Sequence, residues 1–433
     1  MGDSRLVDAR SISLLYHGKD NPALVMSGYA KIGRYVVPYL MDAGYDVRLH
    51  TPVGHQMNVM RWPDPRSGKT LEMWSGGDGP YGESIVPAHM AKLHELSGKH
   101  PFLLFCGDVV ALNEIPKWAA EKRITAAAWG AVDWEWPTPK HALDKFSPFF
   151  RVFPFSHHGY RVLEQDGLKN LLPPVWCGVD TDVFKPVARG AYPDAMASMG
   201  FRLDGFNVFS CFANQFLRKG EAEMFMAVAE FHKRHPEAKI HFFAFTQVRR
   251  EWDLAALVDH LGIRDLVTFS DDYAHVMGEY AEEDVAAMMA SSDCVMSVGY
   301  EGFGLQTCEA QSCERPVIGF NAGATPEILG EGLLVPPEKE FLMNTMFRRP
   351  LPNGLKLVEA LEYVWQNREH SRWRKGRKWV MDNLKWDACG KALVARMDAV
   401  EQAIADEEVL GPPAPGKLGL DRAGRKVVVE AEV

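Results

Sequence analysis

Glu301 and Glu309 are two carboxylates separated by seven residues, and glycines flank Phe303 directly after the first of them. An apolar run at 293–298 precedes the pair, and good helix formers follow from Leu305 onward. This pattern predicts a buried strand, a tight glycine loop and a helix. Each carboxylate can accept hydrogen bonds from hydroxyl groups at a different point of an extended ligand. A ligand with a sugar at one end and a ribose at the other has hydroxyl groups so placed.

A pair of cations forms a second candidate site. Arg218 and Lys219 precede Gly220, between a predicted strand at 206–212 and a predicted helix at 221–235. Positive side chains at the start of a helix oppose the helix dipole, so their presence there indicates a function. The turn is therefore a candidate site for an anionic ligand.

The beginning of the chain has the same order of elements. The sequence predicts a strand at 11–17 and, after a turn that contains Gly28 and Gly33, a helix to about Ala43. Glycine lets backbone come close to a ligand, because it has no side chain. Ligands bind in the crevice at the carboxyl ends of parallel strands, so both glycines are candidate contacts.

The alternation of strands and helices predicts an α/β protein with two parallel sheets. The pattern restarts after a proline-rich stretch that ends at Pro186. We expect an N-terminal domain at 1–186, joined by residues from about 387–410, a C-terminal domain at 187–386 and a mobile tail at 411–433. Residues 54–82 lack periodicity and are predicted to be a long loop, on either the acceptor side or a variable surface.

Composition narrows the classes of function. The chain has 433 residues, 47% of them hydrophobic, and a net charge of −9, which argues against non-specific coating of nucleic acid. Its seven cysteines are scattered without a CxxC pair, which is typical of reduced thiols in the cytoplasm. We expect no signal peptide at the N-terminus and no transmembrane segment, since no apolar run reaches the length needed to span a bilayer.

Together these motifs resemble the family-4 retaining glycosyltransferases, which have the GT-B fold. The resemblance rests on the two glutamates with Gly-Phe-Gly, on the Arg-Lys-Gly turn and on GVD followed by Phe and Pro at 178–186. It covers about residues 11–408. It implies two facing Rossmann-like domains, with a C-terminal helix that crosses back to the N-terminal domain.

The resemblance also implies roles for the candidate residues. Glu301 lies by the donor sugar, Glu309 binds the ribose, and Arg218 and Lys219 hold the diphosphate. The charge on the diphosphate grows as the glycosidic bond breaks, so the two cations stabilise the transition state more than the ground state. The other expected donor-binding residues lie at the turns and in the signature loop: Gly28, Gly33, Asn214, Gly302, Phe303, Gly304 and Leu305.

The acceptor side departs from the family pattern. Related enzymes often have a histidine at the end of the strand predicted here at 124–129, but this strand runs into Asp133 and Glu135. Asp133 is the first polar side chain past the strand, so we expect it to orient or deprotonate the acceptor hydroxyl. Adjacent helical residues diverge by about 100°, so His157 and His158 do not predict a metal site. We expect His157 near the cleft and His158 on the surface.

The predicted activity is transfer of a hexose or similar sugar to an acceptor hydroxyl with retained anomeric configuration. The co-substrate is a UDP-, GDP- or ADP-linked sugar, and the resemblance implies no obligatory cofactor or metal. Glycans, lipid headgroups, small metabolites and hydroxylated DNA bases remain compatible acceptors. A basic, aromatic stretch at 368–378 either meets an anionic acceptor or is a solvated helix face with buried tryptophans. Two alternatives stay open: a nucleotide-sugar-binding protein without turnover, and a nucleotide-sugar epimerase of the same fold.

Overall fold

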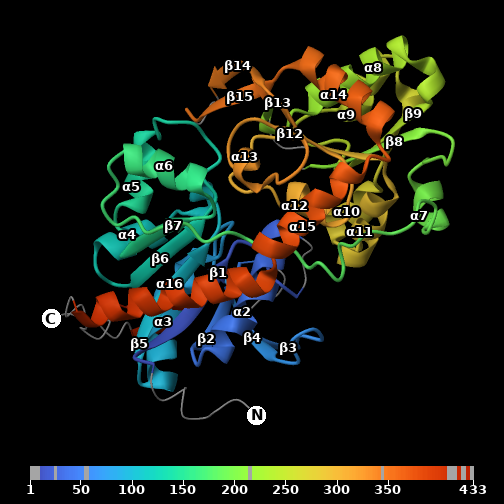
Figure 1. Ribbon diagram of the computed structural model, residues 1–433. Helices are drawn as coiled ribbons and strands as arrows, with labels where there is room; N and C mark the ends of the chain where they lie inside the picture. Colours follow the sequence, from blue (N-terminus) through green and yellow to red (C-terminus); the bar gives the residue numbers. More distant parts are fainter. Residues whose placement is uncertain are drawn as a thin grey trace.

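The computed structural model describes residues 10–23, 27–52, 58–212, 217–342, 346–406, 417–420 and 426–429. They form two lobes, each built around one mainly parallel sheet (Figure 1). The predicted α/β architecture of two facing Rossmann-like domains is confirmed.

The first sheet has the strand order β3-β4-β2-β1-β5-β6-β7, and only β3 runs antiparallel to its neighbour. Its central strands are continuous apolar runs that are buried on both faces, as expected for a parallel sheet covered by helices. Its strands are β1 (Ile12–Gly18), β2 (Asp46–Thr51), β3 (Val59–Pro63), β4 (Thr70–Ser75), β5 (His100–Cys106), β6 (Thr125–Gly130) and β7 (Arg151–Pro154). The helices that follow these strands are α2 (Gly28–Asp42), α3 (Val86–Ser97), α4 (Ile115–Ala120), α5 (Lys140–Phe146) and α6 (His157–Gln165).

The prediction of a long loop at 54–82 was wrong. Residues 59–63 and 70–75 of this stretch form β3 and β4, which pair with each other and extend the first sheet beyond β2. The side chains of β3 alternate between exposed and half-buried positions, so its apolar residues gave no continuous hydrophobic signal.

The second sheet has the order β10-β9-β8-β11-β12-β13 and is parallel throughout. Its strands are β8 (Phe206–Cys211), β9 (Ile240–Phe245), β10 (Val267–Phe269), β11 (Cys294–Ser297), β12 (Val317–Phe320) and β13 (Leu333–Val335). The helices of this lobe are α7 (Pro193–Ser198), α8 (Glu221–Arg234), α9 (Leu254–His260), α10 (Asp272–Met277), α11 (Glu282–Ser291), α12 (Leu305–Ser312), α13 (Thr325–Ile328), α14 (Gly354–Asn367) and α15 (Arg374–Asn383).

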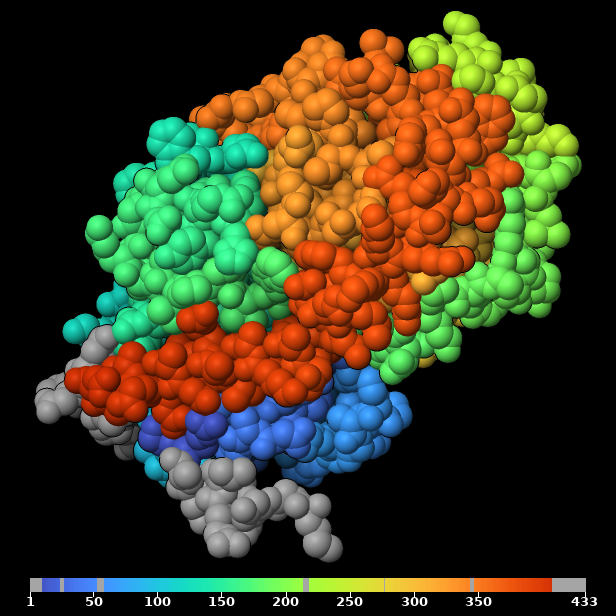
Figure 2. Space-filling model, in the orientation of Figure 1, coloured from blue at the N-terminus to red at the C-terminus, as the bar shows by residue number. Residues whose placement is uncertain are grey.

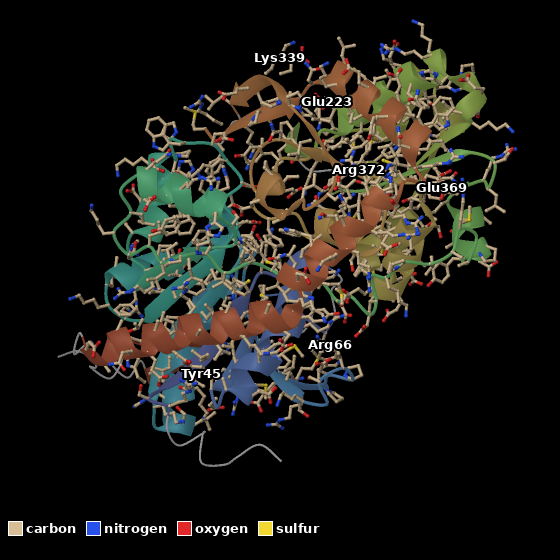
Figure 3. All side chains as sticks on the ribbon, viewed as in Figure 1. Tyr45, Arg66, Glu223, Lys339, Glu369 and Arg372 are labelled. Carbon is tan, nitrogen blue, oxygen red and sulfur yellow. The ribbon has the colours of Figure 1, made fainter. Side chains whose placement is uncertain are left out.

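The last long helix, α16 (Trp386–Asp406), crosses back to the first lobe, as the resemblance implies (Figures 1 and 2). The ring of Trp386 stacks on Tyr35 of α2, with centroids 4.7 Å apart. Further along α16, Asp398 and Glu401 bind Arg10, at 2.6 and 3.1 Å. The hydroxyl of Tyr45, labelled beneath this helix in Figure 3, donates to Asp398 at 2.8 Å. Stacking and ion pairs therefore hold α16 against the N-terminal lobe.

Two antiparallel hairpins were not predicted. β14 (Pro337–Leu342) pairs with β15 (Arg348–Pro352) and extends the C-terminal lobe towards the N-terminal one (Figure 1). β16 (Lys417–Leu420) pairs with β17 (Lys426–Val429) within the stretch expected to be a mobile tail.

The basic, aromatic stretch around α15 serves internal packing. Arg372 pairs with Glu331, and a guanidinium nitrogen of Arg377 donates to the carbonyl oxygen of Ser312 at 2.6 Å. Trp373 is buried. These contacts favour the solvated helix face with buried tryptophans over an acceptor surface. In the described ranges, no helix is long and apolar enough to cross a membrane.

Candidate active site

The signature loop joins β11 to α12 and faces the N-terminal lobe. Gly304 precedes the first residue of α12 with φ 101°, a left-handed conformation that glycine adopts without strain. A Cβ atom at Gly302 would lie 2.7 Å from the Cβ of Ala131 and 2.9 Å from the backbone nitrogen of Val132. Glycine at this position therefore lets the two lobes meet at the loop.

Glu301 binds both predicted cations. Its Oε2 lies 3.1 Å from Nη1 of Arg218, and its Oε1 lies 2.5 Å from Nζ of Lys219. Burial alone would raise the pKa of Glu301, but the ion pairs with Lys219 and Arg218 outweigh burial and lower it. Lys219 and Glu301 also line a small pocket at the carboxyl ends of β8 and β11, together with Ser210, Cys211 and Gln306. The predicted sugar-binding acid and diphosphate-binding cations are thus adjacent.

Asp133 joins this cluster from the N-terminal lobe. Its Oδ2 lies 3.1 Å from Nε of Arg218, and its Oδ1 lies 2.8 Å from Nη2 of Arg349. Two guanidinium groups hold its carboxylate, which is the geometry of an orienting group. Its predicted contact with the acceptor hydroxyl stays a prediction.

Glu309 is engaged by a residue of the other lobe. Nζ of Lys31, on α2, lies 2.5 Å from Oε1 of Glu309 and 3.0 Å from Oε1 of Glu282 on α11. Burial would lower the pKa of Lys31, but the two glutamates raise it to about 12. Burial raises the pKa of Glu309, and Lys31 offsets only part of this effect. The predicted ribose-binding acid therefore belongs to a buried contact between the lobes.

A further carboxylate lies at the carboxyl end of β5 in the N-terminal sheet. Asp108 accepts a hydrogen bond from the hydroxyl of Tyr29 and lies 2.8 Å from Nζ of Lys19. Burial alone would raise the pKa of Asp108, but Lys19 and Tyr29 lower it, and the charge of Arg218 across the cleft adds to this effect. The neighbouring Gly28 meets the signature loop, since a Cβ atom there would lie 3.6 Å from Leu305. These groups lie at the carboxyl end of the first sheet, opposite the signature loop.

Tyr300 connects the two lobes beneath the loop. Its hydroxyl donates to Oε1 of Glu135 at 2.9 Å and lies 2.9 Å from Nε2 of His158. His158 is 6% exposed, whereas the side chain of His157 is exposed. The expectation that His158 lies on the surface was therefore wrong: the helix begins after Ser156, and its second residue turns inward. The backbone nitrogens of both histidines donate to the carboxylate of Glu327 from the other lobe.

Gly33, Phe303 and Asn214 are the remaining residues that were expected to contact the donor. A Cβ atom at Gly33 would lie 3.2 Å from the ring of Tyr16, so this glycine packs within its own lobe. The side chain of Phe303 is buried in the core, which leaves its backbone as the part that can contact a ligand. Asn214 lies outside the described residues.

Sequence reasoning missed Lys31, Asp108, Tyr300 and Arg349. Asp133 was selected as the first polar side chain after a buried strand. The same criterion selects Asp108, which comes shortly after the apolar run of β5. The other three act across the interface between the lobes, and no local pattern marks them.

Two Rossmann-like lobes with a crossing C-terminal helix define the GT-B fold. Residues 211–346 match the family described as glycosyl transferases group 1. This match agrees with the resemblance to glycosyltransferases and lies within the lobe that contains the signature loop.

Relatives and solved structures agree with this assignment. The MMP alpha-(1->4)-mannosyltransferase of Mycolicibacterium hassiacum is 31% identical over 114 residues, which are 26% of this chain and 25% of that protein. A glycosyltransferase from Rickettsia africae is similar in structure, with a TM-score of 0.64 and 15% identity over 90% of this chain and 99% of its own. Anabaena HepE, solved in complex with UDP-glucose, has a TM-score of 0.66 and 13% identity over the same shares. At these identities the structures show the fold.

Within the described part of the chain, no group of three His, Cys, Asp or Glu side chains is arranged to hold a metal ion.

Proposed function

We propose that the protein is a glycosyltransferase that moves a sugar from a nucleotide diphosphate sugar to an acceptor hydroxyl with retained anomeric configuration. The observation that carries this proposal is the contact of Glu301 with both Arg218 and Lys219 at the carboxyl ends of β8 and β11. With Asp133 and Arg349 included, this cluster holds three cations and two carboxylates. The surplus positive charge favours a diphosphate.

The donor lies on the C-terminal lobe in this proposal. The diphosphate meets Arg218 and Lys219, which then stabilise the charge on the departing oxygen better than the charge of the bound donor. The sugar lies by Glu301 and the backbone of Gly302–Leu305, and the ribose lies by Glu309. The solved complexes of Anabaena HepE with UDP and UDP-glucose support UDP as the first nucleotide to test.

The acceptor enters from the N-terminal lobe, between Asp108 and the signature loop. Asp108 and Tyr29 offer a carboxylate and a hydroxyl to an incoming sugar hydroxyl, and Asp133 lies at the same edge of the first sheet. The alpha-(1->4)-mannosyltransferase activity named for the curated relative supports a glycan acceptor over a nucleic acid. The seven free cysteines, six of them buried, support a reducing compartment such as the cytoplasm.

Early-time proton NMR tests transfer and stereochemistry together. The protein is incubated with UDP-, GDP- or ADP-glucose, each an α-linked donor, without any acceptor but water. The proposal expects one donor to be consumed and the released sugar to appear first as the α-anomer. First appearance of the β-anomer would contradict retention. Donor that binds and stays intact, even with oligosaccharides added, would favour a binding protein without turnover.

A further inference from the structure

We propose that Arg349 is a positioning residue, which holds Arg218 through Asp133 in the orientation that receives the donor diphosphate. The inference rests on the proposed function of Arg218. It assigns a role in that site to the β14–β15 hairpin, which no motif marks.

The hairpin is anchored in the opposite lobe. Phe347, directly before β15, is 2% exposed and packs within the hydrophobic core of the N-terminal lobe. Its ring centroid lies 4.6 Å from that of Trp134 and 5.6 Å from that of His141. A C-terminal segment therefore contributes to the N-terminal core.

Backbone contacts fix the register of this docking. The backbone nitrogen of Glu135 donates to the carbonyl oxygen of Arg348 at 2.9 Å. Nη1 of Arg348 donates to the carbonyl oxygen of Trp136 at 2.8 Å. The side of β14 that carries Lys339 lies at the outer edge of the molecule (Figure 3). These contacts place the next residue, Arg349, against Asp133.

The guanidinium of Arg349 contacts Asp133 at two atoms. Its Nε donates to the backbone oxygen of Asp133 at 2.5 Å, and its Nη2 binds Oδ1 at 2.8 Å. The Arg349 side chain is only 6% exposed, so the pair is shielded from water. The second carboxylate oxygen is left facing Nε of Arg218 at 3.1 Å. One residue of the hairpin thus fixes both the backbone and the carboxylate that orient Arg218.

This arrangement determines how Arg218 meets a diphosphate. Asp133 holds the Nε edge of the guanidinium, while Glu301 and the backbone oxygen of Tyr300 hold Nη1. A guanidinium oriented in this way presents a fixed edge to an anion. Without Arg349, the Asp133 carboxylate is free to rotate, and Arg218 loses the contact that fixes its Nε edge. A lysine in place of Arg349 keeps the charge but cannot make the two directed contacts.

Calorimetric titration tests the inference, with UDP, GDP and ADP as probes. Arg349→Gln, Arg349→Lys and Asp133→Asn are each expected to weaken the tightest-binding nucleotide about 10-fold, which corresponds to one lost charge-assisted hydrogen bond. Because Arg349 acts through Asp133, the Asp133→Asn/Arg349→Gln double variant should bind the nucleotide no more weakly than the weaker-binding of the two single variants. Losses that add in the double variant would overturn the proposal.

Two controls separate the possible failures. Arg372→Gln removes a half-buried ion pair with Glu331 in the C-terminal lobe, away from the hairpin (Figure 3), and should not change nucleotide affinity. Lys219→Ala should weaken binding whatever the role of Arg349. If Lys219→Ala weakens binding and both Arg349 variants bind normally, the inference is wrong while the proposed function stands. If none of the variants changes the affinity, the proposed function fails. Thermal unfolding of each variant confirms that it is folded, and Arg349→Lys replaces Arg349→Gln if the latter is not.

Discussion

Nζ of Lys31, in the N-terminal lobe, lies 2.5 Å from Oε1 of Glu309, in the C-terminal lobe. Both side chains are largely buried, and Glu282 shares the lysine at 3.0 Å. The carboxylate predicted to bind the donor ribose is therefore held by the opposite lobe. In the proposed function, the carboxylate that binds the ribose also takes part in the ion pair that joins the two lobes.

Lys31→Met should destabilise the protein strongly. The substitution leaves Glu309 and Glu282 buried without their cation, and breaking a buried ion pair in this way costs roughly 3–5 kcal/mol. Urea unfolding gives the change in the free energy of unfolding. Lys378→Met is the control, since Lys378 is 78% exposed in its pair with Asp382 and should cost about 1 kcal/mol or less. Adding Glu309→Gln to Lys31→Met should recover part of the loss, and a fully additive loss would contradict direct pairing.

Lys219→Ala should slow transfer. Lys219 faces the charge that develops on the diphosphate, so its removal should lower kcat/KM by about 100- to 1,000-fold. Nucleotide release from the donor consumed in the NMR experiment gives the rate. A variant with near-normal turnover would remove the diphosphate assignment from this lysine.

A buried histidine cluster should make the N-terminal lobe sensitive to acid. The ring centroids of His17 and His50 lie 4.4 Å apart, and Nδ1 of His50 lies 3.1 Å from Nδ1 of His89. Burial lowers the pKa of His17 to about 3 and that of His89 to about 4, and it lowers the pKa of His50 well below its ordinary value. The unfolded chain takes up protons from about pH 6.5 downward, whereas the folded cluster does not, so stability falls as the pH drops from there towards 3.

His17→Phe tests this sign. Both ring nitrogens of His17 are buried without a hydrogen-bond partner among the described residues, and phenylalanine has a similar shape without a titrating group. The melting temperature of the variant should exceed that of the wild type by more at pH 5 than at pH 7.5. His260→Gln, at an exposed position, should leave the difference between the two pH values unchanged. An equal acid-induced loss in His17→Phe and wild type would contradict the account.

Glu221 should have the opposite pH dependence. It is 5% exposed, and burial raises its pKa to about 7, with Lys219 only partly opposing this. A raised carboxyl pKa means that stability is lost as the pH rises from about 4.5 through 7. Glu221→Gln should therefore raise the melting temperature at pH 8 and not at pH 4.5. At pH 8 the gain in the free energy of unfolding should be up to about 3 kcal/mol. The exposed Glu369 (Figure 3) provides a control variant, Glu369→Gln, for which no such gain is expected.

The strands and helices of the two sheets followed from local pattern. Apolar runs such as those of β5 and β8 are buried on both faces, and glycine or proline marks their ends, so the periodicity of the sequence was sufficient. β3, β4 and the β14–β15 hairpin were missed, because strands with many half-buried or exposed positions carry no continuous hydrophobic signal.

The site was predictable where its residues share one loop or turn. Glu301, Arg218 and Lys219 were selected by motif, and the structure brings them together. Lys31 and Arg349 were not, because their significance arises from contacts between residues hundreds of positions apart, and a single sequence does not display such pairs. His158 was misplaced because the direction of one helix turn decides which of two adjacent histidines is buried.

Calorimetric titration of the wild type and Lys219→Ala with UDP-, GDP- and ADP-glucose tests the central claim most directly. The account predicts that one of the three binds the wild type, stabilises it against heat and binds the variant at least about 10-fold more weakly, since one charge-assisted contact to the diphosphate is lost. Failure of the wild type to bind any of them would contradict a nucleotide-sugar site at Glu301, Arg218 and Lys219.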